Sequence, residues 1–79
     1  MQNSDQNDVP SIEIKGSYIE LCKLLKLENW VGTGGEAKHV ISEGYVLLNG
    51  KVETQKRKKV MDGDIVEFQD YIIQIQSKK

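Results

Sequence analysis

Residues 33–52 read TGGEAKHVISEGYVLLNGKV and contain a helix start, a helix end and a hairpin turn in one short segment. Thr33 and Glu36 form a capping box, in which the threonine oxygen accepts a backbone N–H of the first helical turn. A helix is therefore predicted over residues 34–43, and Gly44 is expected to end it in the left-handed conformation. Its apolar residues have the three-to-four spacing of one buried stripe: Ala37, Val40 and Ile41.

The dipeptide Asn49-Gly50 follows at the centre of a predicted hairpin. A two-residue type I′ turn needs positive φ at both central positions, and Asn-Gly is the pair that adopts this conformation most readily. The flanking segments 45–48 and 51–54 carry apolar residues suited to short strands. This predicts two antiparallel strands directly after the helix.

Toward the N-terminus, residues 1–10 are polar and acidic and are predicted to be a disordered tail. The alternation in residues 11–15 predicts a short strand. Ser17 and Glu20 have the spacing of a second capping box, which predicts a helix from there to about Glu28, with Asn29 as its C-cap. Its apolar stripe would be Tyr18, Leu21, Cys22, Leu24 and Leu25.

Toward the C-terminus, residues 55–59 form a basic run without apolar period and are predicted to be a loop. Asp62-Gly63-Asp64 reads as a turn stabilised by the aspartate side chains. Residues 65–68 and 71–76 are predicted to be a final strand pair. The order of strand, two helices and four short strands predicts an α+β fold, with residues 11–79 as a single domain.

Several classes of function are disfavoured by composition. One cysteine and one histidine cannot supply the ligands of a structural zinc site, and no internal disulfide can form. No apolar run approaches the length of a membrane span, and the N-terminus lacks the features of a signal peptide. No nucleophile–base set or paired carboxylates suggest catalysis. The chain is therefore expected to be a cytoplasmic protein that is not an enzyme, without metal or cofactor.

The charges are segregated along the chain. Residues 38–59 contain six basic and two acidic side chains, which leaves five basic and ten acidic residues elsewhere. A basic region on an otherwise acidic chain suits a polyanionic partner such as nucleic acid. A solvated loop is as good an interpretation of the run alone, and a module that binds an acidic protein is the alternative function.

The motifs together resemble the S-four (S4) RNA-binding domain, also called the alpha-L RNA-binding motif. The resemblance rests on residues 33–38 at a helix start, Ile41-x-x-Gly44 at its end, Val46-x-Leu48-Asn49-Gly50-Lys51-Val52 in the hairpin, and Val60-x-x-Gly63-Asp64-x-Val66. It covers about residues 18–68 and is closest to small stand-alone bacterial members. It implies two helices packed on a small, mainly antiparallel sheet, and binding of structured RNA.

The resemblance also implies which residues line the RNA. The implied contacts, extended to the whole basic run, are Thr33, Gly35, Lys38, His39, Asn49, Lys51, Lys56, Arg57, Lys58 and Lys59. One departure concerns Gly34, because the family usually has an arginine there that can clamp a phosphate with two hydrogen bonds. Ribosomal RNA or tRNA is the expected partner, with the ribosome or a modifying enzyme as further partners of a monomeric chain.

Three single residues have two interpretations each, and a fourth has one. Trp30 is expected to anchor the core, although it could also stack on a base. Cys22 is expected to be a small core residue. Tyr45 could pack on the hairpin or contact RNA. His39 could tune RNA binding with pH or be an ordinary exposed helical residue.

Overall fold

A computed structural model describes residues 9–77 of the chain. The predicted disordered tail lies outside this range except for its last two residues, and the Pro10 carbonyl already accepts the Gln74 N–H at 2.8 Å. The described part contains two helices and seven strands. They are β1 (Ser11–Ile14), β2 (Tyr18–Glu20), α1 (Leu21–Leu27), α2 (Gly34–Ser42), β3 (Val46–Leu48), β4 (Lys51–Val52), β5 (Lys59–Met61), β6 (Ile65–Phe68) and β7 (Tyr71–Ser77).

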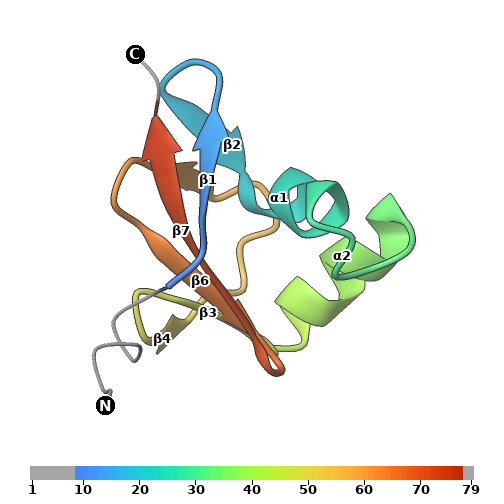
Figure 1. Ribbon diagram of the computed structural model, residues 1–79. Helices are drawn as coiled ribbons and strands as arrows, with labels where there is room; N and C mark the ends of the chain where they lie inside the picture. The colour runs from blue at the N-terminus through green and yellow to red at the C-terminus, as the bar shows by residue number, and fades with distance from the viewer. Residues whose placement is uncertain (1–8, 78–79) are drawn as a thin grey trace.

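Five of the strands form one sheet in the order β1-β7-β6-β3-β4. Among residues 9–77, β1 and β7 pair in parallel, and the other neighbours in this sheet are antiparallel. Figure 1 shows both helices on one side of this sheet. The predicted α+β fold, with two helices on a mainly antiparallel sheet, is therefore confirmed.

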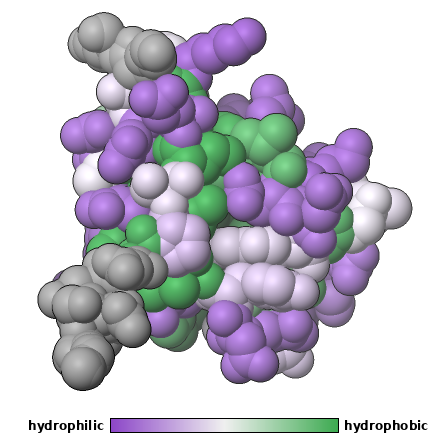
Figure 2. Space-filling model, viewed as in Figure 1, coloured by the Kyte–Doolittle hydropathy of each residue, from purple (hydrophilic) through white to green (hydrophobic). Residues whose placement is uncertain are grey.

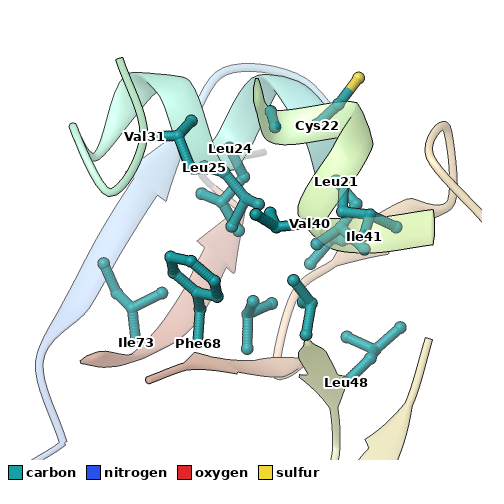
Figure 3. Packing of buried hydrophobic residues seen from close by; sticks show 14 of the residues in the cluster. Leu21, Cys22, Leu24, Leu25, Val31, Val40, Ile41, Leu48, Phe68 and Ile73 are labelled. Carbon is teal, nitrogen blue, oxygen red and sulfur yellow. The ribbon is translucent and has the colours of Figure 1, made fainter. Parts of the chain in front are cut away.

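The core lies between the helices and the sheet. Figure 3 shows leucine, valine and isoleucine side chains of the helical segment directed toward Phe68 and Ile73 of the sheet. Alternation along β6 places Val66 and Phe68 on this buried side, as the two-residue period of a strand requires. Cys22 belongs to the same cluster with 7% of its surface exposed, which confirms its expected place in the core.

The predicted start of the first helix is wrong. Tyr18 and Ile19 form strand β2, which pairs antiparallel with β5, and α1 begins only at Leu21. The predicted capping box at Ser17 does not form, because the N-cap is Glu20 and no side chain caps the helix. The pairing of β2 with β5 keeps this segment extended, so a tertiary contact overrides a local helix signal. Tyr18 is consequently 43% exposed rather than part of a buried stripe.

The same pairing corrects the expectation for the basic run. Lys59 is the first residue of β5 and lies opposite Glu20 in the register, so five strands follow the helices instead of four. The run had no apolar period, and its strand contains a single buried residue, Val60. Such a short strand carries too little alternation to be recognised from sequence.

Both helices end in a Schellman motif, with a left-handed residue after the cap. In α1 this residue is Asn29, with φ of 60°, and in α2 it is Gly44, with φ of 85°. The N–H groups of Trp30 and Tyr45 then reach back to the carbonyls of Leu25 and Val40. Within residues 9–77, neither helix has the length and apolar character needed to span a membrane.

Candidate nucleic-acid interface

The basic loop between β4 and β5 is held against the start of α1. The N–H of Leu21 donates to the Lys58 carbonyl at 2.9 Å, and the N–H of Cys22 donates to the Lys56 carbonyl at 3.0 Å. A third bond, from the Lys58 N–H to the Gln55 carbonyl, closes the loop on itself at 3.2 Å. Because the backbone carbonyls face the helix, the loop is fixed in place while its basic side chains stay exposed.

Arg57 is the loop residue that faces a cavity bordered by both helices. It lines an open cavity of about 190 Å³ together with Lys23, Lys26 and Lys38. The same cavity is bordered by Gly34, the first residue of α2, where an added Cβ would have no neighbour within 4 Å. Four cations from three separate segments therefore border one small space, which is also lined by Glu20.

Arg57 also lines a larger groove of about 900 Å³ between the hairpin and the loop. Cations from both sides border this groove, namely Lys51 of β4 and Lys58 and Lys59 from the loop and β5. Two carboxylates, those of Glu53 and Asp64, also line it. The cavity and the groove share Arg57, so together they define one basic surface, which we call the basic surface below: Lys23, Lys26, Lys38, Lys51, Arg57, Lys58 and Lys59.

The start of α2 confirms its predicted threonine cap. The Thr33 Oγ1 accepts the Glu36 N–H at 3.0 Å, while the Glu36 carboxylate accepts the N–H of Gly32 at 2.9 Å. In a capping box the glutamate accepts the N–H of the N-cap residue itself. Here Glu36 accepts the N–H of Gly32, the residue before the N-cap. Among residues 9–77, no acceptor pairs with the N–H groups of Gly34 and Gly35. Free N–H groups at a helix start favour an anion.

Asn49 has a structural part in the fold, and its predicted contact with RNA stays a prediction. Its φ of 54° and that of Gly50, 85°, confirm the predicted turn. Its Nδ2 donates to Asp64 Oδ1 at 3.0 Å, and its Oδ1 accepts the Ile65 N–H at 2.9 Å. Asp64 Oδ2 in turn accepts the Met61 N–H. The Asn49 side chain therefore connects the hairpin to the turn before β6. The aspartate turn is stabilised as predicted.

Lys59 differs from the three basic residues before it. Its Nζ lies 4.9 Å from the centroid of the Tyr18 ring, a cation–π distance. Lys59 therefore packs on strand β2 while it borders the groove.

The predicted contact residues do not all converge. Thr33 and Gly35 lie at the start of α2, next to the cavity lined by Gly34, whereas His39 and Lys56 line neither the cavity nor the groove. Sequence reasoning missed Lys23 and Lys26, which it placed only on the face of the first helix opposite the buried stripe. Their three-residue spacing puts them on one helix face, and this was the available signal.

Comparison with known families gives the class of protein. The model of the S4 domain family matches residues 12–76, which is most of the chain. The chain therefore belongs to the S4 domain family, and the resemblance found in the sequence is confirmed.

Individual relatives agree with this assignment. "Putative RNA-binding protein YbcJ" of Escherichia coli (strain K12) is 46% identical over 61 residues, which cover 77% of this chain and 87% of that protein. "Probable ribosome maturation protein RlbA" of Bacillus subtilis (strain 168) is 35% identical over 60 residues, covering 76% and 84%. The solution structure of Escherichia coli YbcJ, described as containing an alpha-L motif involved in RNA binding, superposes with a TM-score of 0.67. It is 36% identical, and the match covers 96% of this chain and 95% of that one.

Proposed function

We propose that this protein binds structured RNA through the basic surface and catalyses no reaction. The observation that carries the proposal is the position of Arg57, which joins the four-cation cavity to the groove beside the hairpin. Phosphates follow one another along an RNA backbone, so cations grouped on one surface suit them better than scattered charges do. The names of the relatives, which refer to RNA binding and to ribosome maturation, support the same partner.

The form of the surface favours recognition of RNA shape and backbone. Lysine and arginine supply its charge, and these groups bind phosphates without reading a base sequence when they act from outside the grooves. The free N–H groups of Gly34 and Gly35 add hydrogen-bond donors for a phosphate near Lys38. We therefore infer a folded RNA, either ribosomal RNA or tRNA, as the ligand of a monomeric chain in the cytoplasm, with the ribosome or an RNA-modifying enzyme as further partners.

The test is a pair of matched triple charge reversals. In the first variant Lys56, Arg57 and Lys58 are replaced by glutamate, and in the second Lys15, Lys78 and Lys79 are replaced in the same way. Both change the net charge by the same amount, but only the first alters the basic loop. For each variant and for the unmodified protein, we measure the RNA retained from cell extract. We also measure the affinity of each protein for ribosomal RNA and tRNA at several salt concentrations.

We expect the loop variant to lose RNA binding while its circular dichroism stays native, and the control variant to keep it. Affinity of the unmodified protein should fall steeply with salt, because each neutralised phosphate releases counterions. Equal binding by the two variants would contradict the proposed surface. Retention of a protein partner after nuclease treatment, with no RNA bound, would instead favour the acidic-protein alternative.

A further inference from the structure

The groove beside the hairpin combines cations with exposed apolar side chains. Val52 of β4 is 59% exposed and Met61 of β5 is 51% exposed, and both line this groove. Within β5, Met61 lies on the same face as Lys59 and opposite the buried Val60, because successive side chains of a strand point to opposite sides. The groove therefore presents apolar side chains next to ammonium groups.

Exposed apolar and aromatic side chains elsewhere have partners within the protein. Figure 2 shows hydrophobic and weakly polar side chains across the middle of one face, with hydrophilic side chains around them, so such surface is not confined to the groove. Tyr71 is 47% exposed but stacks at 5.3 Å on Trp30, which packs against the core as expected. Tyr18 lies under the ammonium of Lys59. What distinguishes the groove is that its apolar side chains lie among cations on the basic surface.

An unpaired nucleotide has the chemistry that such a groove can hold. The outside of an RNA duplex offers phosphates and hydroxyls, because its bases are stacked and its major groove is too narrow for side chains. An unpaired nucleotide offers in addition the flat face of a base, and a thioether makes favourable contacts with aromatic rings. The groove of about 900 Å³ has the size of a small-molecule pocket, roughly 300–1,000 Å³, so one nucleotide has room in it.

One carboxylate in the groove suits the edge of a base rather than a phosphate. Glu53 lines the groove, and its Oε2 accepts the Gln55 N–H at 3.1 Å, which holds the carboxylate in place. Among residues 9–77, no donor pairs with its other oxygen. Asp64, by contrast, has both oxygens bonded within the hairpin and the turn before β6. Glu53 is therefore placed to accept an amino group, such as N4 of cytosine.

We propose that this groove holds one unpaired nucleotide of the bound RNA. The base lies against Met61 and Val52, and its flanking phosphates lie at Arg57 and Lys58. Glu53 accepts an amino group of the base, so cytosine is preferred to uracil, which carries the acceptor O4 in place of that amino group. This inference rests on the proposed function and specifies the ligand further, as an RNA with a bulged or looped-out base at the contact.

The first experiment compares a short RNA duplex with the same duplex carrying one unpaired cytosine. We expect the full-length protein to bind the bulged RNA roughly tenfold more tightly, which corresponds to 1.4 kcal/mol, because two exposed apolar side chains become covered. Met61→Ala should remove most of this difference. Leu27→Ala, which truncates a 56% exposed side chain outside the groove, should keep it. Native circular dichroism is the check on folding.

The second experiment tests the role of Glu53 with an unpaired cytosine or an unpaired uracil in the same duplex. We expect cytosine to be preferred roughly fivefold or more. Glu53→Gln should abolish the preference, because an amide offers a donor as well as an acceptor. Glu43→Gln makes the same change at the end of α2, outside the groove, and should leave the preference intact. The ratio of two affinities cancels the general effect of removing a negative charge.

Failure of this inference can be told apart from failure of the proposed function. Equal affinity for the continuous and the bulged duplex, or a full preference in the Met61 variant, would overturn the inference while the RNA site stands. Equal affinity for the cytosine and uracil RNAs would overturn the role of Glu53. Absence of binding to every RNA would contradict the proposed function and this inference with it.

Discussion

The two helices begin in different ways, although the sequence carries the same capping signal at both predicted starts. Each is preceded by a hydroxyl residue with glutamate three positions later, at Ser17 and at Thr33. At α2 the threonine caps its own helix. At α1 the first N–H groups are instead taken by carbonyls of the basic loop, about 35 positions further along the chain.

The difference shows that a capping signal works only where the chain is free to follow it. Residues 18–20 form a strand that pairs with β5, so the helix begins only at Leu21. The consequence concerns the site as well as the fold. The start of α1 is closed to a ligand but positions Arg57, whereas the start of α2 keeps the N–H groups of Gly34 and Gly35 available.

Amide hydrogen exchange should show the largest contrast between the two starts. The N–H groups of Leu21 and Cys22 are bonded to the loop and should exchange only when the fold opens. Those of Gly34 and Gly35 have no acceptor among the described residues and should exchange roughly a thousandfold or more faster, given the several kcal/mol by which small domains are stable. Similar rates measured by NMR would mean that the loop does not cap α1.

A core substitution at the start of α1 should have the next largest effect. Leu21 is fully buried, so Leu21→Ala removes packing and is expected to lower the free energy of unfolding by about 2–5 kcal/mol. Leu27→Ala, at the 56% exposed end of the same helix, should cost less than about 0.5 kcal/mol. Chemical denaturation measures both, and equal losses would argue against the described packing of α1.

The hairpin turn combines a local signal with long-range bonds, and two variants separate them. Asn49→Ala should lower stability by about 2 kcal/mol, because it removes two hydrogen bonds and puts alanine, which adopts positive φ less readily than asparagine, at this position. Asn49→Gly also loses the bonds but tolerates the backbone conformation, so it should cost about 1 kcal/mol less. If the two variants were equally stable, positive φ at this position would have no measurable cost.

The two capping signals provide the smallest and most direct test. Thr33→Ala should lower the free energy of unfolding by about 1 kcal/mol, because the Glu36 N–H loses its acceptor. Ser17→Ala should change it by less than about 0.5 kcal/mol, since no cap depends on this hydroxyl. A larger loss for the serine variant than for the threonine variant would reverse the comparison.

The parts of the fold that sequence predicted share a local cause. The second helix, its end at Gly44, the Asn49-Gly50 turn and the last strand pair each depend on residues a few positions apart. The missed strands β2 and β5 are three residues long, and each is stabilised mainly by the other, across 38 intervening residues. No local pattern marks such a pair.

For the candidate site, sequence identified most of the charges but not their grouping. The basic run and Lys38 were recognised from charge, and the contacts assigned to them stay predictions. Lys23 and Lys26 joined them only because α1 and α2 pack side by side and the loop closes over α1. His39 and Lys56 fell outside the cavity and the groove for the same reason, since the packing of the elements decides where each side chain points.

The sequence by itself determined the family, the two-helix and hairpin framework and the presence of a basic region, because capping, turn chemistry and charge are properties of short segments. Only the tertiary structure decided where α1 begins, that Asn49 ties the hairpin to the turn before β6, and that Arg57 joins two groups of cations. Those features depend on contacts between residues far apart in the chain, and such contacts form only when the whole core is packed.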